Sequence, residues 1–301
     1  MEKTTLRTKY GPYFAQLLKV SHAAAKIDET NVYQPGNPQT LEIMQRVVTD
    51  NIKSGSRLEG RENLIKFCDM VKEGKSGLIL AEHFSNCDLP NFLYLLKNDE
   101  DPRLQELSSK IVAIAGMKLN EEDPFIRAFS ECFTRVVIYP TRSQNAVEAS
   151  NMTEEEKIAE ETRAKKINFA AMRAMDNCKR RGEVILVFPS GTRYRPGHPE
   201  TKRGLREIDS YLRLFDIVTL ISINGNIVRI DPENEKDMLG DLVVQDQIIC
   251  SASEIIECKP FRKQFMANLP QDEADPKQKI IDYLMGIMEK QHDEIEKIRD
   301  K

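Results

Sequence analysis

The fold is decided by residues 78–90, Leu-Ile-Leu-Ala-Glu-His-Phe-Ser-Asn-Cys-Asp-Leu-Pro. The four apolar residues at the start of this stretch predict a buried strand that ends just before His83. Ser85 or Asn86 can cap a helix that follows, and Pro90 suits the first turn of that helix. A buried strand that passes directly into a helix is the repeating step of an α/β protein.

Four more apolar runs resemble this strand, because each is short and rich in β-branched residues. Longer amphipathic stretches separate them, and an alternation of buried strands with helices predicts a layered α/β fold. We expect a mixed, mostly parallel sheet flanked by helices, with residues 241–251 as one more strand or an edge. The four runs are Ile111–Ala115, Val136–Tyr139, Val184–Phe188 and Ile217–Ile223.

Helices are predicted at both ends of the chain and in its middle. Thr153 and Glu156 have the spacing of a capping box, and an apolar stripe over residues 164–178 follows them. A second apolar stripe, over residues 280–288, predicts a C-terminal helix. Residues 1–72 have helical spacing apart from a break in a segment that contains Pro and Gly. We therefore expect a helical N-terminal region at 1–72 and an α/β domain at 73–301.

Composition limits the classes of function. The 301 residues carry a net charge of −4, and 31% of them are charged residues of both signs, which argues against a nucleic-acid-binding protein. No apolar run is long enough to cross a membrane, and the first residues lack the apolar core of a secretory signal. The six cysteines form no Cys-x-x-Cys pair, and His83 and Cys87 have no second pair of metal ligands. We expect reduced cysteines, no metal and a cytoplasmic protein.

The motifs of three common enzyme classes are either incomplete or absent in this sequence. Gly55 and Gly60 are spaced as in a phosphate-binding P-loop, but Arg61-Glu62 replaces the Lys-Ser/Thr that should follow. No Gly-x-Gly-x-x-Gly follows a predicted strand, and Ser190 does not lie in a Gly-x-Ser-x-Gly nucleophile elbow. The sequence therefore does not support nucleotide hydrolysis, dinucleotide binding or serine hydrolysis.

His83 and Asp88 are the first candidates for catalysis. The predicted strand leads into His83, and Asp88 falls at the start of the next helix, where its carboxylate can fold back towards the imidazole. A carboxylate that accepts a hydrogen bond from one ring nitrogen leaves the other nitrogen as a general base. By spacing alone, a helix-capping aspartate beside a structural histidine is the better interpretation.

A second candidate site follows the strand predicted at 184–188. Its sequence is Pro-Ser-Gly-Thr-Arg-Tyr-Arg-Pro-Gly, residues 189–197, in which a tight turn precedes Arg193 and Arg195. In a bent loop the two guanidinium groups can converge on a phosphate, whose oxygens match the planar donors of arginine. Ion pairs with acidic helices are the alternative, and these residues alone do not separate the two.

Taken together, the two segments resemble the glycerolipid acyltransferase family. His-x4-Asp after one strand and Phe-Pro-Ser-Gly-Thr-Arg after a later strand are similar to that family's two motifs and stand in its order. Residues 190–196, Ser-Gly-Thr-Arg-Tyr-Arg-Pro, resemble the Ser-Gly-Gly-Arg-x-Arg-Pro block of the soluble plastid-type glycerol-3-phosphate acyltransferases. Segments 112–116, 123–125 and 161–166 are also similar to that group, so the resemblance covers about residues 75–225.

The resemblance implies a role for each part of the two segments. In the family the histidine is the base, the aspartate orients it, and the later arginines bind the phosphate of the acceptor. The turn residues would support the loop or supply donors to the oxyanion. Carried onto this sequence, the roles fall on His83 and Asp88 for catalysis, on Arg142, Arg193 and Arg195 for the phosphate, and on Ser190, Gly191 and Thr192 for the turn.

Departures from the family pattern affect the acceptor. Arg142 and Ser143 stand where the plastid-type group has Lys-His, and Leu89 separates Asp88 from the proline that usually follows. Three further cations nearby in sequence are weaker phosphate candidates, with a solvated surface position as the simpler interpretation; they are Lys202, Arg203 and Arg206.

The resemblance implies acyl transfer from acyl-CoA or acyl carrier protein to sn-glycerol 3-phosphate in phospholipid synthesis, without a cofactor. A lysophosphatidate acyltransferase is the alternative within the family, and a non-catalytic lipid- or phosphate-binding module is the alternative of another class. The expected location is the cytoplasm or a soluble compartment like the plastid stroma. Peripheral membrane contact through the apolar stripe at 13–20 or at 280–288 is an alternative to ordinary packing of those stripes.

Overall fold

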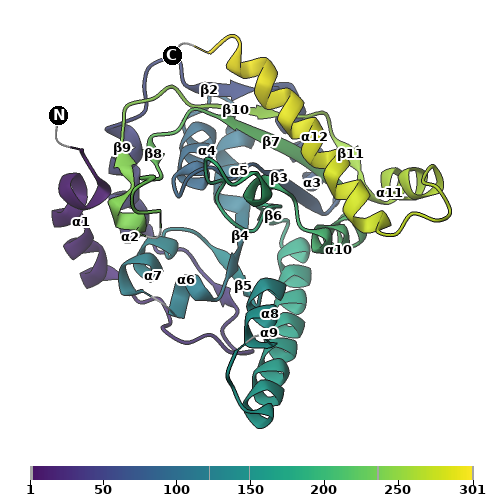
Figure 1. The fold of residues 1–301 in the computed structure, drawn as a ribbon. Coiled ribbons are helices and arrows are strands. Elements are labelled where there is room, and N and C mark those ends of the chain that lie inside the picture. Colours follow the sequence, from purple (N-terminus) through teal and green to yellow (C-terminus); the bar gives the residue numbers. More distant parts are fainter. Residues whose placement is uncertain (1–2, 122, 149, 236, 300–301) are drawn as a thin grey trace. The chain divides into compact units, whose positions relative to one another are not determined.

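The computed structural model describes residues 3–121, 123–148, 150–235 and 237–299 (Figure 1). The chain divides into two compact units, and each is made of segments that are distant in sequence. Unit 1 contains residues 1–11, 45–111 and 186–301, and unit 2 contains residues 12–44 and 112–185. The N-terminal residues 1–72 therefore contribute to both units.

The sheet of unit 1 is mixed, and its two longest strands are completely buried. β3 (Gly77–Ala81) runs parallel to β7 (Ile217–Asn224), and Leu80 lies opposite Leu220. Every residue of both strands is buried, in line with their largely apolar sequence. Further strands of this sheet include β10 and β11, antiparallel to β7, and β2, parallel to β10; their bounds are Ile249–Ala252, Ile256–Glu257 and Arg57–Glu59.

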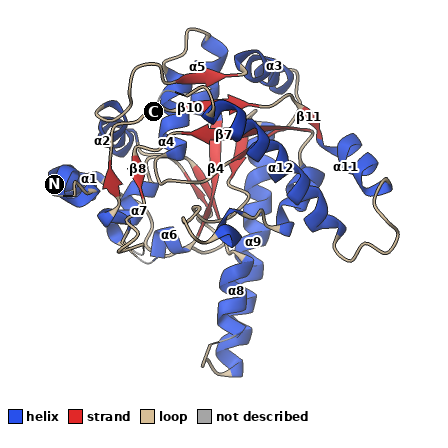
Figure 2. Ribbon diagram, turned by 45° about the horizontal axis from the view of Figure 1, so that its top comes forward, coloured by secondary structure: helices blue, strands red, loops and turns tan. Residues whose placement is uncertain are grey.

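Helices cover this sheet, and the C-terminal helix α12 (Pro276–Glu296) matters most for the site. It runs along β7 and β10 and buries Ile280, Ile281, Leu284 and Met288 (Figure 1, Figure 2). The apolar stripe predicted at 280–288 is therefore a packing face. The other helices of unit 1 are α3 (Arg61–Lys72), α4 (Asp88–Lys97), α5 (Pro102–Lys110), α10 (Asp209–Leu214) and α11 (Cys258–Ala267), with 3-10 turns η1 (Pro199–Lys202), η2 (Arg206–Ile208) and η3 (Met238–Gly240).

Unit 2 combines parallel and antiparallel pairing with a long helix. β5 (Arg135–Ile138) runs parallel to β4 (Ile111–Gly116). The long helix, α9 (Glu154–Arg180), begins at a capping box in which the side chains of Thr153 and Glu156 each accept a hydrogen bond from the other's backbone N–H. The remaining elements are β1 (Tyr33–Gln34), antiparallel to β5, and the helices α6 (Lys118–Glu121), α7 (Pro124–Ser130) and α8 (Thr141–Glu148).

Some elements contain residues of both units, so the chain passes from one unit to the other inside regular structure. These elements are α1 (Leu6–Val20), α2 (Pro38–Thr49), β4 and β6 (Val184–Val187). A small two-stranded sheet in unit 1 joins β8 (Val228–Arg229) to β9 (Leu242–Val243) in antiparallel pairing.

The predicted α/β class and all five predicted strands are confirmed. Residues 241–251 contribute to β9 and β10, and the N-terminal region adds two short strands, β1 and β2, that were not predicted. Neither strand contains an apolar run that the sequence could reveal. Each is a strand because it pairs with a neighbour, β1 with β5 and β2 with β10. In the described part of the chain, no helix combines the length and apolar character that crossing a membrane requires.

Candidate active site

The predicted pair of His83 and Asp88 forms, and all of it lies within unit 1. β3 ends at Ala81, and Asp88 is the first residue of α4. Oδ2 of Asp88 accepts hydrogen bonds from His83 Nδ1 at 3.0 Å and from the backbone N–H groups of Phe84 at 2.6 Å and Ser85 at 2.8 Å. The aspartate thus holds both the imidazole and the chain that joins strand to helix.

The carboxylate of Asp88 determines which ring nitrogen of His83 carries the proton. The Asp88 side chain is 1% exposed and that of His83 is 18% exposed. A carboxylate only accepts hydrogen bonds, so Nδ1 carries the proton and Nε2 of the neutral ring keeps its lone pair. No residue in the described part of the chain hydrogen-bonds to Nε2. His83 can therefore take a proton from a bound molecule.

The two motif segments meet at His83. The Phe188 ring, directly after β6, stacks on the imidazole with ring centroids 4.0 Å apart and an interplanar angle of 14°. The backbone N–H of Tyr194 donates to the carbonyl oxygen of His83 at 2.7 Å, and the Tyr194 ring packs edge-on against Phe84. The loop that carries Arg193 is thereby fixed beside the histidine.

The turn after Phe188 is closed by its own hydrogen bonds. The N–H of Gly191 donates to the carbonyl oxygen of Phe188 at 2.9 Å, and the Ser190 hydroxyl donates to that of Thr192 at 2.7 Å. Gly191 has a φ of 62°, which glycine adopts without steric cost. Because both donors are used inside the turn, the geometry favours loop support over donation to an oxyanion for Ser190 and Gly191.

Arg193 forms a buried ion pair. Its guanidinium contacts the carboxylate of Asp241, and the two side chains are 11% and 0% exposed. Burial raises the pKa of Asp241 to about 6, although the charge of Arg193 opposes this shift. The positive charge of Arg193 is already compensated, so the ion-pair alternative describes this residue better than phosphate binding does.

The other cationic candidates differ in their surroundings. Arg195 is partly buried, and no acidic partner of its guanidinium lies in the described part of the chain. Arg142 lies on α8 of unit 2, and its side chain is outside the described residues. The ammonium of Lys202 pairs with Glu289 at 2.9 Å. Ser143, at the other position where the family pattern differs, also lies on α8.

A narrow pocket of about 10 Å³, room for about one water molecule, lies beside His83. Met285 of α12 and Lys202 of η1 form part of its wall, so the C-terminal helix belongs to the site. Sequence reasoning missed Met285, because nothing in an apolar helical stripe marks one residue as the lining of a pocket. The residues around this pocket are Ala81, Glu82, His83, Phe84, Pro189, Ser190, Tyr194, Lys202 and Met285.

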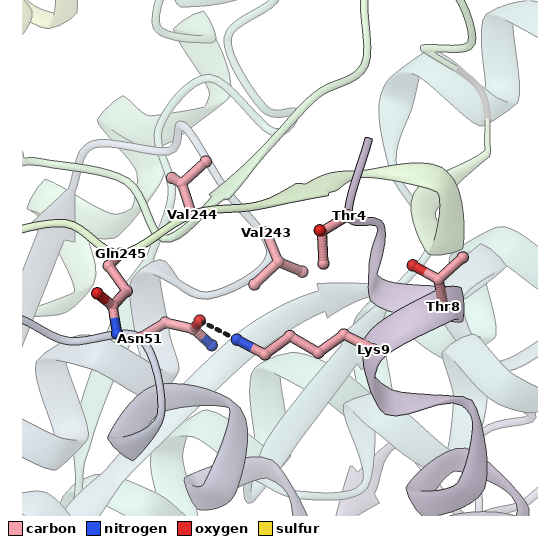
Figure 3. Close-up of a pocket in the computed structure, with 7 residues that line it drawn as sticks. All are labelled: Thr4, Thr8, Lys9, Asn51, Val243, Val244 and Gln245. Atoms are coloured by element: carbon pink, nitrogen blue, oxygen red, sulfur yellow. Dashed lines mark hydrogen bonds between the residues drawn. The ribbon is translucent and has the colours of Figure 1, made fainter. Parts of the chain in front are cut away.

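A second pocket, of about 440 Å³, lies near the start of α1 (Figure 3). Lys9 points into it, and the Lys9 ammonium donates to the side-chain oxygen of Asn51 at 2.8 Å. None of the described residues around it is a histidine, cysteine or carboxylate, so this pocket offers no acid–base pair. The residues are Thr4, Thr8, Lys9, Asn51, Val243, Val244 and Gln245.

Comparison with known proteins adds no assignment. No model of a known protein family matches this chain, and no curated protein matches its sequence. The geometry around His83 is therefore the basis for a proposal of function.

Proposed function

We propose that this protein transfers an acyl group from an acyl thioester to a hydroxyl of sn-glycerol 3-phosphate. One observation carries the proposal: the imidazole of His83 is held through Nδ1 by the buried Asp88 and lines a pocket at the end of a strand. The arrangement suits a general base. The resemblance of the two motif segments to glycerolipid acyltransferases suggests which reaction the base serves.

In the proposed reaction, Nε2 of His83 accepts the proton of the acceptor hydroxyl as the hydroxyl oxygen attacks the thioester carbonyl carbon. The carbon–oxygen bond forms, the carbon–sulfur bond breaks, and the proton passes from the imidazolium to the leaving thiolate. Asp88 stabilises the imidazolium between these two steps. The thioester supplies the driving force, so the reaction requires neither a redox cofactor nor a metal ion.

The acceptor phosphate needs cations near the base. Lys202 lines the same pocket as His83, and Arg195 follows the turn that packs beside it. Arg142 is a further candidate by resemblance alone. One guanidinium nitrogen of Arg193 is held by Asp241, so we assign Arg193 to the stability of the loop.

The test measures release of free thiol when the purified protein receives a long-chain acyl-CoA and one acceptor. Release with glycerol 3-phosphate, and not with lysophosphatidate, is the expected result. Release with lysophosphatidate alone would identify the alternative acceptor. If both acceptors fail with acyl-CoA and with acyl carrier protein as the donor, the proposal is wrong and the binding-module alternative is tested next.

A further inference from the structure

We propose that His292, on the C-terminal helix α12, is a positioning residue for His83 and acts through Glu82. The inference rests on the proposed function, because the position of His83 matters for turnover only if His83 is the base. Three observations support this role: the burial of Glu82, the contacts of His292 with both neighbours of His83, and the compensation of charge between Glu82 and His292.

Glu82 is a buried carboxylate between β3 and His83, and its residue is 4% exposed. Its backbone N–H donates to the carbonyl oxygen of Ile221 at 3.0 Å, which extends the pairing of β3 with β7 by one residue. Its Oε2 accepts a hydrogen bond from the N–H of Ile223 at 2.9 Å and lies 2.8 Å from Nδ1 of His292. A buried carboxylate needs such partners, because an uncompensated buried charge is costly.

His292 contacts the residues on both sides of His83. Its ring is paired with Glu82 and packs on Phe84 with ring centroids 5.2 Å apart. Its own backbone is held as well, since its carbonyl oxygen accepts from the side-chain amide of Asn224 at 2.9 Å. One side chain that fixes residues 82 and 84 limits how far the backbone of His83 can move.

Charge strengthens this contact. Burial by itself would lower the pKa of His292, but the hydrogen bond and the charge of Glu82 outweigh burial, and the pKa is raised. Glu296 also favours the imidazolium, whereas Lys202 opposes it. Glu289, one turn earlier on α12, pairs with Lys202 and reduces that opposition. His292 therefore compensates the charge of Glu82 as well as its hydrogen-bonding capacity.

Loss of His292 would leave the Glu82 carboxylate with a backbone N–H as its remaining partner in the described part of the chain. We expect the carboxylate to turn towards water and to loosen residues 82–84. A small displacement of a catalytic group reduces the rate strongly, so we expect kcat to fall by about 10- to 100-fold, with a smaller change in KM.

Three variants separate positioning from simple anchoring of α12. His292→Ala removes the imidazole, and His292→Asn keeps a donor close to the place of Nδ1. Gln291→Ala is the matched control, because the Gln291 amide also ties α12 to the sheet, through the Ser222 hydroxyl at 3.1 Å and the Ser251 carbonyl oxygen. Neither of these two hydrogen bonds involves Glu82. The thermal midpoint of each variant shows whether the measured protein is folded.

The first readout is the kcat and KM of acyl transfer, and the second is the imidazole Nδ1–H signal of His83 in 15N-edited NMR. The chain has four histidines, and loss of the signal in His83→Gln assigns it. The proposal expects His292→Ala to lower kcat and to broaden this signal, Gln291→Ala to do neither, and His292→Asn to restore part of both. Equal effects of His292→Ala and Gln291→Ala, or an unchanged His83 signal in folded His292→Ala, would overturn it.

The two proposals can fail separately. If the wild-type protein transfers no acyl group but the His83 signal responds only to His292, the proposed function fails and the positioning contact stands. If the wild-type protein is an acyltransferase and folded His292→Ala retains its kcat, the positioning role fails alone.

Discussion

Asp88 uses a single carboxylate oxygen for three hydrogen bonds, one to the imidazole of His83 and two to backbone N–H groups. The same oxygen therefore sets the tautomer of the histidine and the path of the chain between β3 and α4. Asp88 is not a helix cap, because the backbone N–H groups that it binds belong to Phe84 and Ser85, which precede α4. One side chain therefore holds both the chain between β3 and α4 and the imidazole of His83.

Asp88→Asn should lower kcat by about 10²–10⁴ while the fold persists, because an amide can present its NH2 group to His83 and disfavour the productive tautomer. Thiol release at saturating substrate measures the change. Asp101→Asn is the matched control, since Asp101 caps α5 by accepting from the N–H of Arg103 and does not line the pocket. A kcat above half the wild-type value in Asp88→Asn would leave Asp88 with the structural role of holding the chain between β3 and α4.

Arg193 and Arg195 should respond in opposite ways to the same substitution. Arg193→Met leaves Asp241 buried without its cation and should lower the free energy of unfolding by about 3–5 kcal/mol. Arg195→Met should change stability little and raise KM for the acceptor, because no acidic partner of its guanidinium lies among the described residues. Urea unfolding and acceptor titrations measure the two effects. A stable Arg193→Met protein with a raised KM would return Arg193 to the phosphate site.

The sequence predicts those features of helices and strands that depend on residues close together in the chain. The ends of β3 and β6, the capping box of α9 and the buried stripe of α12 depend on residues a few positions apart, and the structure contains all of them. The partners of Glu82 and Arg193 could not be predicted, because His292 is 210 residues from Glu82 and Asp241 is 48 residues from Arg193. A charged residue at the end of an apolar run was the one local sign that Glu82 needs a partner.

The contact between α12 and the end of β3 should make stability depend on pH. The pKa of His292 is raised in the folded protein, so its contribution is complete below the unfolded value and is lost as pH rises through the folded value. We expect the free energy of unfolding to fall more between about pH 6 and pH 9 in the wild type than in His292→Asn, which cannot titrate. Urea unfolding at both pH values tests this, and equal losses in the two proteins would contradict it.

At the scale of the whole molecule, unit 1 is built from three segments of the chain, and the last of them supplies α12. The division predicted at residue 72 was placed where the helical spacing of the N-terminal region gives way to short apolar strands that alternate with helices. Compact units follow spatial contacts instead, and pairing of β3 with the much later β7 places residues from the first third and the last third of the chain in one core.

Deletion of residues 276–301 should prevent stable folding of unit 1. The deletion removes four fully buried side chains, which together contribute about 6–12 kcal/mol at the usual value for burying a large aliphatic residue. That range is comparable to the whole stability of an ordinary domain, about 5–15 kcal/mol. Circular dichroism and gel filtration measure the outcome. A folded monomer with a wild-type thermal midpoint would show that α12 is dispensable for the core.

The role of His83 as the base is tested by kcat of acyl transfer to glycerol 3-phosphate in His83→Ala. His198→Ala is the control, because His198 lies in the same arginine-bearing loop region but its side chain is 53% exposed and pairs with Glu200. If His83 is the base, kcat falls by about 10²–10⁴ in His83→Ala and stays at the wild-type value in His198→Ala. A folded His83→Ala protein that keeps more than half of the wild-type kcat would contradict the account.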